Sequence, residues 1–595
     1  MDALMDADGT LRFGSFELDV RSRELRTGQA IVRLQEQPFE ILRMMLERPG
    51  AVVTRDELRR RLWPDGTFVD FEHSLNAAVK RLRAALGDDA DNPRFVETLP
   101  RRGYRFICAL GAEGSDKASA GVPRVAVLPF SNLSDEGSQE YFTDGLTEEM
   151  IAQLGQRCRG RLGVIARWSS MVFKGSTQRS REIGQALRAN YLLEGSVRRE
   201  GDRVRVTASL VETASETHLW SETYERHLTD CLQVQSDIAA RIAESLALEL
   251  VPETAPAGRH NAATSTSASA YQEYLKGRYY WNHWSTRNVD SLGVRPDDEG
   301  LEQAMSSFAE ALQIDPHFAP AYASLSRAHI ARAVHYREQP RRVLEAARTA
   351  AKRALELEPE LFEAHLALAD IRRMLEWDWR GAEAAYVQAI ALNPSQENAH
   401  RGYGAMLMAL SRTDEAMRES DRACELDPLC LVVNTNAAWV RYLAGDYEAA
   451  LERCRRTAEL DPQYLPARRM IGQIFVQMGK TRDAIEVLEA AHAEAPKDPI
   501  LASALACAKG VAGDRSGSLT VLEGIRRLER TRYLPQYQVA LVHVALHDHD
   551  RAFATLEQAT VDADPALGYL KVDPRISPVR SDARYARLID LLGLS

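Results

Sequence analysis

The chain has 595 residues, of which 45% are hydrophobic and 27% charged, and its formal net charge at pH 7 is −10. This length exceeds what one hydrophobic core supports, so three or more domains are expected. No apolar run of about 18 residues could cross a membrane, and the start, MDALMDADGT, lacks the basic and apolar regions of a signal peptide. We therefore expect a cytoplasmic protein that has no contact with a membrane.

Motifs for catalysis or metal binding do not occur in the sequence. The seven cysteines form no CxxC pair and no cluster with histidines, which is typical of buried thiols in a reducing compartment. Phosphate-binding GxxxxGK[ST] loops, kinase motifs, GxSxG and HExxH are all missing. The pair Asp144–Gly145 is interpreted as a cap or turn and not as a ligand site. The prediction is a protein that is not an enzyme and has no cofactor and no metal.

Two stretches, residues 111–122 and 252–269, are rich in small and polar residues and have no apolar period, so they are interpreted as flexible linkers. The predicted division is a disordered N-terminus (1–10), a first module (11–108), a linker (109–123), an α/β domain (124–250), a second linker (251–269) and a repeat array (270–595). Between Leu11 and Leu110 there are 18 Lys and Arg against 15 Asp and Glu. A weakly basic module on an acidic chain favours specific binding to DNA.

The first module begins with short strand-like runs, LRFGSFELDV, ELRTG and AIVRLQ. A helix is predicted from about Gln37 to Glu47, and Thr54 is predicted to cap a second helix that runs through Glu57 to Leu62. A third helix is predicted over residues 71–87, with one buried stripe of apolar residues at helical spacing. The stripe consists of Leu75, Val79, Leu82 and Leu86.

The opposite face of the third helix is narrow, with small residues between polar and cationic ones. Its members are His73, Asn76, Ala77, Lys80 and Ala84, with Arg81 and Arg83 flanking them at positions suited to phosphates. Such a face fits a DNA major groove about 12 Å wide. The following hairpin, FVETLPRRGYRFI, carries Arg101 and Arg102 at its tip, where they could reach the DNA backbone or minor groove.

The predicted DNA-binding residues are therefore His73, Asn76, Lys80, Arg81, Arg83, Arg101 and Arg102. The residues by themselves are also consistent with a helix face and a turn that contact only solvent. Tyr104, next to the tip of the hairpin, is predicted to pack its ring in the core and not to contact DNA.

Strands, three helices and a hairpin, with RLRAALGD followed by RFVETLPRRGYRF, closely resemble the OmpR/PhoB-type winged-helix DNA-binding domain over residues 11–108. The resemblance implies that the third helix reads the major groove through Asn76, Lys80 and Arg81, and that Arg101 and Arg102 form the wing contacts. Only ten residues precede the module, so no phospho-accepting receiver domain is expected. The arrangement is similar to CadC-like regulators, with a polar linker in place of their transmembrane helix.

The middle segment alternates predicted strands and helices. VAVLPF and LGVIARWSS are predicted strands, and TDGLTEEMIAQLGQ and REIGQALRANYLLE are predicted helices. A hairpin is expected to turn at residues 200–202, and a last helix from about Asp230 to Leu250. The phrases VAVLPFSNLS, YFTDGLTEEMIAQL and YLLEGSVRREGDRVRV resemble the TolB amino-terminal-like domain, which implies a compact α/β layer fold.

The last region repeats with a period of 34 residues, which is the tetratricopeptide spacing. The repeats close at Pro394, Pro428, Pro462 and Pro496. Two further registers hold mostly small residues, as two closely packed antiparallel helices require: Ala382, Ala416, Ala450, Ala484, Ser518 and Ala552, and Ala389, Ala423, Thr457, Ala491, Ile525 and Ala559. Pro316 and Pro359 are 43 residues apart, so a longer turn or helix is expected there, and a final amphipathic helix should cap the solenoid.

The resulting prediction is a multidomain α+β protein: a winged helix-turn-helix, a small α/β domain and an all-α tetratricopeptide solenoid. Its predicted function is that of a one-component transcriptional regulator that binds double-stranded DNA, with a homodimer on tandem sites as one arrangement. The solenoid is predicted to bind a protein or peptide partner, or an effector. The alternative is a tetratricopeptide scaffold whose winged helix does not bind DNA.

Overall fold

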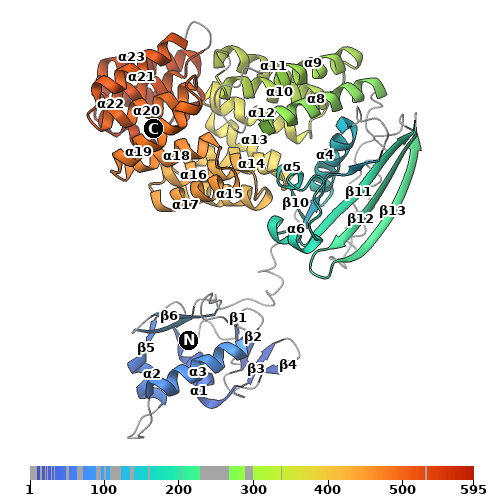
Figure 1. The fold of residues 1–595 in the computed structure, drawn as a ribbon, viewed down its shortest axis with the longest axis vertical. Coiled ribbons are helices and arrows are strands. Elements are labelled where there is room, and N and C mark those ends of the chain that lie inside the picture. Colours follow the sequence, from blue (N-terminus) through green and yellow to red (C-terminus); the bar gives the residue numbers. More distant parts are fainter. Residues whose placement is uncertain are drawn as a thin grey trace. The chain divides into compact units, whose positions relative to one another are not determined.

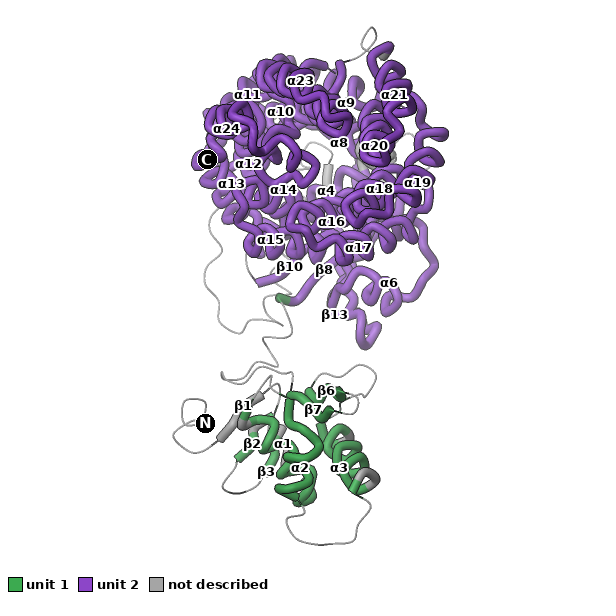
Figure 2. Tube along the Cα trace, turned by 90° about the vertical axis from the view of Figure 1, so that its left-hand side faces the viewer, with its two compact units in different colours: residues 1–122 green, residues 123–595 purple. Residues whose placement is uncertain are grey.

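The computed structural model describes most of the chain and forms two compact units, residues 1–122 and residues 123–595 (Figure 2). We call them the N-terminal unit and the C-terminal unit. The described residues exclude 1–9, 14–15, 20–21, 23, 28–29, 33, 49–51, 63–70, 87, 89–94, 100–101, 107–121, 134–139, 159–160, 201–202, 228–266, 288–298, 337 and 529–532.

The N-terminal unit begins with a four-stranded antiparallel sheet whose strands pair in chain order (Figure 1). Its strands are β1 (Thr10–Phe13), β2 (Phe16–Asp19), β3 (Glu24–Thr27) and β4 (Ala30–Val32). A second, three-stranded sheet has the order β5-β7-β6. Its strands are β5 (Val52–Thr54), β6 (Val96–Leu99) and β7 (Gly103–Phe106). The expected order of strands, helices and hairpin is thereby confirmed.

Three helices pack against these sheets around one core: α1 (Glu36–Glu47), α2 (Arg55–Leu62) and α3 (Phe71–Leu86). The predicted apolar stripe of α3 is confirmed, since its four residues are at most 3% exposed. The predicted cap of α2 is also present, because the Glu57 carboxylate accepts from the Thr54 backbone N–H at 2.8 Å and the Thr54 hydroxyl accepts from the Glu57 N–H at 3.2 Å. This reciprocal pair satisfies two backbone donors of the helix start.

The C-terminal unit begins with a mixed sheet in the order β10-β8-β11-β12-β13, with the short β9 paired to β11. Its strands are β8 (Arg124–Val127), β9 (Ser131–Asn132), β10 (Gly163–Ile165), β11 (Tyr191–Glu200), β12 (Arg203–Glu212) and β13 (Thr217–His227). The helices of this region are α4 (Glu140–Arg157), α5 (Arg167–Met171) and α6 (Ser180–Leu187). β8 pairs in parallel with β10 and β11, while β11, β12 and β13 are antiparallel.

Three predictions for this sheet region had different outcomes. The hairpin is confirmed, since Glu200 pairs with Arg203. The predicted helix REIGQALRANYLLE is wrong in its second half, because α6 ends before Arg188 and YLLE forms the start of β11. Arg188 has a left-handed φ of 51°, and the following apolar residues pair with β8 in the sheet interior, so tertiary pairing overrides helix propensity there. The predicted helix at 230–250 lies outside the described residues.

Paired antiparallel helices form the rest of the C-terminal unit. They are α8 (Ala268–Arg287), α9 (Glu299–Ile314), α10 (Ala319–Val334), α11 (Pro340–Leu357), α12 (Phe362–Ile371), α13 (Trp379–Leu392), α14 (Glu397–Ala409), α15 (Thr413–Leu426), α16 (Leu431–Leu443), α17 (Tyr447–Leu460), α18 (Leu465–Gln477), α19 (Thr481–Glu494), α20 (Pro499–Val511), α21 (Arg515–Leu528), α22 (Gln536–Ala545), α23 (His549–Asp562) and α24 (Ala583–Leu591). A π-helical turn, η4 (Arg372–Glu376), follows α12, and the 3-10 helices η5 (Pro565–Tyr569) and η6 (Pro574–Val579) precede α24.

The helical solenoid and its 34-residue registers are confirmed. All twelve residues of the two registers are at most 1% exposed, and they lie on the second helix of each pair. The longer spacing before Pro359 reflects longer helices, since α10 has 16 residues and α11 has 18, against 13 and 14 in α14 and α15.

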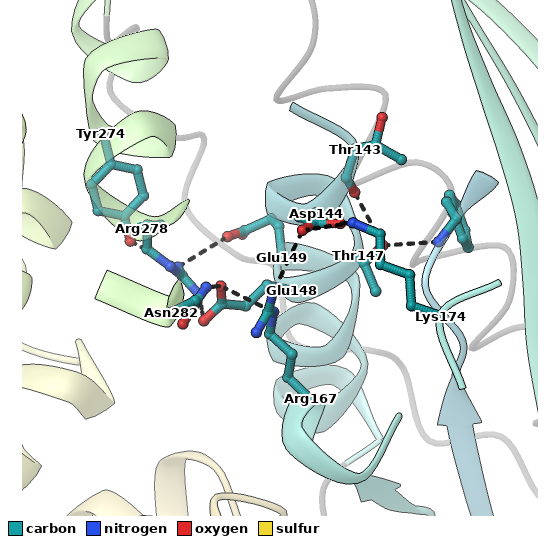
Figure 3. Close-up of polar contacts among 11 residues, drawn as sticks. Thr143, Asp144, Thr147, Glu148, Glu149, Arg167, Lys174, Tyr274, Arg278 and Asn282 are labelled. Carbon is teal, nitrogen blue, oxygen red and sulfur yellow. Dashed lines mark hydrogen bonds and ion pairs between the residues drawn. The ribbon is translucent and has the colours of Figure 1, made fainter. Parts of the chain in front are cut away.

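The sheet region and the array share a partly buried polar contact between α4 and α8, drawn in Figure 3. Glu148 of α4 forms an ion pair with Arg278 of α8 and lies 3.9 Å from Arg167 of α5. Burial opposes the ionisation of Glu148, but the two arginines outweigh it and hold the pKa of its carboxyl below the usual range. The helices approach closely, because a Cβ on Gly145 would lie 2.8 Å from a methyl carbon of Leu275. Asp144–Gly145 therefore lies inside α4 and is not a turn.

A second contact joins the sheet region to the turn that follows α15. The Asp427 carboxylate accepts from the Ser169 hydroxyl at 2.6 Å and from its backbone N–H at 3.0 Å, and both residues are buried. The Ala166 N–H donates to the carbonyl of Leu426 at 2.8 Å. The repeat-ending ELDP turn thus also serves as a docking point for the sheet.

The C-terminal end of the array returns to its early helices and closes a ring (Figure 2). Hydrogen bonds between distant residues make the closure, among them Tyr336 OH to Asp564 Oδ1 (2.9 Å), Gln339 Nε2 to Asp562 Oδ1 (2.7 Å) and Trp379 Nε1 to the Leu592 carbonyl (2.7 Å). The last helix, predicted as a cap, is present as α24, and the segment around it also closes the ring. Among the described helices, none is long and apolar enough to span a membrane.

Candidate nucleic-acid interface

The outward face of α3 presents three of the predicted residues to solvent. Asn76, Lys80 and Arg81 are exposed, while the apolar stripe on the other side of the helix is buried. The Arg81 Nε donates to the carbonyl of Ala77 at 3.2 Å, and its guanidinium also contacts the Gln35 side chain. These bonds hold the Arg81 stem along the helix while its charge stays at the surface.

Arg83 is placed differently from its neighbours on α3. Its side chain is 12% exposed, and its guanidinium donates to the Val96 carbonyl at 2.6 Å and to the Thr98 hydroxyl at 2.9 Å. It also lies 3.9 Å from the Asp88 carboxylate. Arg83 was expected beside phosphates, and the structure instead uses it to fasten α3 to β6.

Two predicted residues lie outside the description: Arg101 entirely, and His73 in its side chain. Arg102 is exposed in the turn between β6 and β7, where its N–H donates to the Leu99 carbonyl at 3.0 Å. Tyr104 is 3% exposed, as its predicted core position requires.

Arg55, at the start of α2, joins the helix face to the wing. Its backbone N–H donates to the Arg102 carbonyl at 3.2 Å, and its guanidinium donates to the Asn76 amide oxygen and the Tyr104 hydroxyl, each at 3.3 Å. The Tyr104 hydroxyl also donates to the Asn76 amide oxygen at 2.9 Å. Because Arg55 contacts Asn76, Tyr104 and Arg102, it fixes the position of α3 relative to the turn between β6 and β7.

Sequence reasoning missed Arg55 and the other basic residues of α2. Arg59, Arg60 and Arg61 are all exposed in the last turn of this helix. The Arg59 guanidinium lies 5.8 Å from the Phe71 ring at the start of α3, which brings its charge to the α2–α3 side of the unit. The signal available in the sequence was the triple arginine of RDELRRRL.

Gly103 lets the wing strand lie against β5. A Cβ at this position would lie 2.1 Å from the Val53 carbonyl oxygen, and its φ of +157° is rare for L-residues. The RRGYRF phrase therefore has a steric reason for its glycine. Within the described part of the chain, no group of three or more His, Cys, Asp or Glu residues could hold a metal ion.

Comparison with protein families assigns the parts of the chain. Residues 28–106 match the family described as transcriptional regulatory protein, C terminal, so the N-terminal unit contains a winged-helix domain of the OmpR/PhoB type. Residues 122–241 match the HilA/YgeH-like transcriptional regulator second domain, and residues 441–506 match a tetratricopeptide repeat. The predicted recognition of the winged helix and of the repeats is thereby confirmed.

Individual relatives are named either as transcriptional regulators or activators, or as an adenylate cyclase. Transcriptional regulator HilA of Salmonella typhimurium is 22% identical over 76% of this chain and 76% of its own length. The cholera toxin homolog transcriptional activator of Vibrio parahaemolyticus is 36% identical over 22% of this chain and 44% of its own length. Putative adenylate cyclase 3 of Rhizobium meliloti is 31% identical over 47% of this chain. The chain spans 44% of the length of the last two relatives.

Proposed function

We propose that this protein is a one-component transcriptional regulator that binds double-stranded DNA in a sequence-specific manner. α3 would enter the major groove with Asn76, Lys80 and Arg81, and the wing turn with Arg102 would contact the flanking backbone or minor groove. The observation that carries the proposal is the Arg55 bridge, which holds the exposed face of α3 and the wing turn together. The names of the Salmonella and Vibrio relatives support the same function.

Arg59 and Arg60 of α2 would add contacts to phosphates, because both are exposed on the same helix as Arg55. His73 and Arg101 remain proposed contacts, whereas Arg83 would act by positioning α3 through its bonds to β6. We also propose that the protein binds tandem half-sites as a homodimer. We do not propose the adenylate cyclase activity that the name of the Rhizobium relative states, because the chain spans 44% of that protein.

The domain division is proposed as the sequence predicts it, with a small α/β domain over residues 124–250 between the winged helix and the repeats. This domain would transmit the state of the array, since it contacts α8 and the turn after α15. The array would bind a protein or peptide partner, or an effector. Mild proteolysis should cut first within 111–122 and 252–269, and early cleavage inside the repeats would contradict this division.

Selection of duplexes from a random library by the full-length protein, and separately by residues 1–110, tests the proposal. We expect one shared enriched motif, and its binding constant should fall with salt by about 0.9 log units per log unit of salt for each phosphate neutralised. Enrichment by the fragment alone would mean that the C-terminal unit holds the intact protein inactive. Enrichment by neither would favour the scaffold alternative.

A further inference from the structure

The closed ring of helices surrounds an interior cavity of about 570 Å³. The first helices of successive pairs, from α10 to α18, contribute to its wall, together with α4 and α8 from one side and η5 and η6 from the other. Figure 2 looks into this ring. Because the C-terminal segment is fastened to the early helices, residues of η5 and η6 complete the wall that the concave face of the array begins. A volume of this size is typical of sites for small molecules, which range over roughly 300–1,000 Å³.

Three arginines of the wall form no ion pair with a described carboxylate: Arg327 of α10, Arg401 of α14 and Arg469 of α18. Arg401 donates only to the amide oxygen of Asn398, and the Nε of Arg469 is buried without any hydrogen-bond partner. Other wall arginines are neutralised within the protein, namely Arg278 by Glu148, Arg373 by Asp370 and Arg575 by Asp573. The unpaired set is thus a property of particular positions and not of the whole wall.

Carboxyls of the same wall act on two of these three arginines. Glu363 and Glu397 line the cavity without an ion pair to a described arginine, and one oxygen of Glu363 is buried without a hydrogen-bond partner. Burial raises the pKa of Glu363 to about 7 and also raises that of Glu397. Arg327 acts on both of these carboxyls and Arg401 acts on Glu397, whereas the carboxylate that acts on Arg469 is that of Asp498, which does not line the cavity. Glu363 and Glu397 therefore offset Arg327 and Arg401 rather than Arg469.

The wall combines an unpaired cation with polar and aromatic groups. Gln473 lies four residues after Arg469 on α18, so both side chains share one face of the helix, and the Gln473 amide oxygen is also buried without a partner. Trp439 of α16 and Tyr569 of η5 line the same cavity and meet edge to face, with ring centroids 5.7 Å apart; the Trp439 ring also stacks on Tyr442 and lies 5.5 Å from the Arg575 guanidinium. A charged group to fix one end and aromatic side chains to contact an apolar body are the elements of a ligand site.

We propose that this cavity binds a small anionic molecule with a flat apolar body, whose acidic group is bound by Arg469 and whose N–H or O–H group donates to the Gln473 amide oxygen. The body would lie against Tyr569 and the edge of Trp439. Carboxylates and phosphates share the chemistry that a guanidinium recognises. The site is separate from the DNA interface, and its occupancy can be measured without DNA.

Titration of the full-length protein with anilinonaphthalene sulfonate, an anionic fluorescent probe with a flat body, tests the proposal. The wild-type protein should show one saturable site, and Arg469→Met should weaken binding about tenfold or more, because a charge-assisted bond is lost. Arg469→Lys should retain part of the affinity. Arg468→Met is the matched control, since its guanidinium pairs with Glu494 at 2.7 Å and does not line the cavity.

The uncharged probe N-phenyl naphthylamine separates loss of charge from loss of structure. It should bind wild type and Arg469→Met with similar affinity, whereas partial unfolding of the variant would raise the fluorescence of both probes. Displacement of the anionic probe by phenyl phosphate or by benzoate then identifies the acidic group that the site prefers. Equal binding of the anionic probe by wild type, Arg469→Met and Arg468→Met, or no saturable binding by wild type, would overturn the proposal.

Discussion

Lys80 and Arg81 lie on the exposed face of a helix in the N-terminal unit, whereas Arg469 lies on a helix that lines the interior of a ring in the C-terminal unit. Helical spacing is the same in both, but the residues are exposed to solvent in one case and line a cavity in the other. An exposed cationic face can contact a polymer of phosphates. A cation in the wall of a cavity can be reached only by a ligand that fits the cavity. The difference shows that the surroundings of an arginine, and not its presence, decide what it can bind.

The largest effect should come from weakening the partly buried ion pair between the sheet region and the array. Glu148→Gln removes the nearer carboxylate of Arg278 and leaves only Glu149, at 3.9 Å, so we expect the C-terminal unit to lose about 3 kcal/mol of unfolding free energy. Chemical denaturation of the full chain measures this. Glu494→Gln, which breaks the exposed pair with Arg468, should cost about 0–1 kcal/mol. Equal losses in both variants would contradict the assigned role.

Replacing the exposed cations of α3 should weaken DNA binding, whereas replacing the largely buried Arg83 should lower stability. Lys80→Ala combined with Arg81→Ala should lower affinity for the selected duplex about tenfold to a hundredfold and leave the melting temperature unchanged. Arg83→Met should lower the melting temperature of the N-terminal unit, because it removes bonds to Val96 and Thr98. Anisotropy titration and thermal unfolding measure the two effects. Unchanged affinity in the double variant would remove α3 as the reading helix.

Replacing Gly103 by alanine should lower the unfolding free energy of the N-terminal unit, whereas replacing Gly524 by alanine should raise that of the C-terminal unit. Gly103→Ala places a Cβ against the Val53 carbonyl and should cost the N-terminal unit about 1–3 kcal/mol. A methyl group added at Gly524 of α21 would meet no other atom within 4 Å, so Gly524→Ala should stabilise the C-terminal unit by up to about 1 kcal/mol. Denaturant midpoints of the two unfolding transitions provide the comparison, and a neutral Gly103→Ala would show that the wing strand can move away.

Because of Glu363, the C-terminal unit should be more stable in mild acid than at neutral or higher pH. Its folded pKa of about 7 lies above the ordinary 4.5, so the penalty for burying its charge is full above pH 7 and disappears as the pH falls towards 4.5. We expect an amplitude of about 1 kcal/mol, since the cavity reduces the desolvation. Glu363→Gln should remove this part of the pH profile, measured by denaturation at pH 5 and pH 8. An unchanged profile would mean that Glu363 keeps its ordinary pKa.

Glu57 should give the smallest effect, with the opposite sign. Hydrogen bonds from Thr54 and Arg48 lower the pKa of its carboxyl to about 2, so its stabilisation is present above pH 4.5 and is lost as the pH falls towards 2. Because the side chain is 34% exposed, Glu57→Gln should cost about 0.5 kcal/mol at neutral pH. Thermal unfolding of the N-terminal unit at pH 7 and pH 3 tests this, and a larger loss at pH 3 would contradict it.

Local signals in the amino-acid sequence were enough to specify several elements. The stripe through Leu75 and Leu86 specifies α3, the Thr54–Glu57 pair specifies the start of α2, and the 34-residue period specifies the helix pairs. The first two depend on residues within a few turns of one another, and the third on a repeat that appears as a fixed spacing, so spacing alone is informative. The exposed positions of Asn76, Lys80 and Arg81 follow from the same helical periodicity.

Contacts between residues far apart in the chain required the tertiary fold. YLLE became a strand because β8 pairs with it, Arg83 turned to β6, and Arg55 bridged α3 and the wing across 21 and 47 residues of sequence. The ring closes because Asp562 and Asp564 meet residues more than 220 positions earlier. Pairing of this kind depends on where helices and strands come to lie in space, and no local pattern encodes it. The cavity wall likewise combines helices of the array with η5 and η6 of the returning segment.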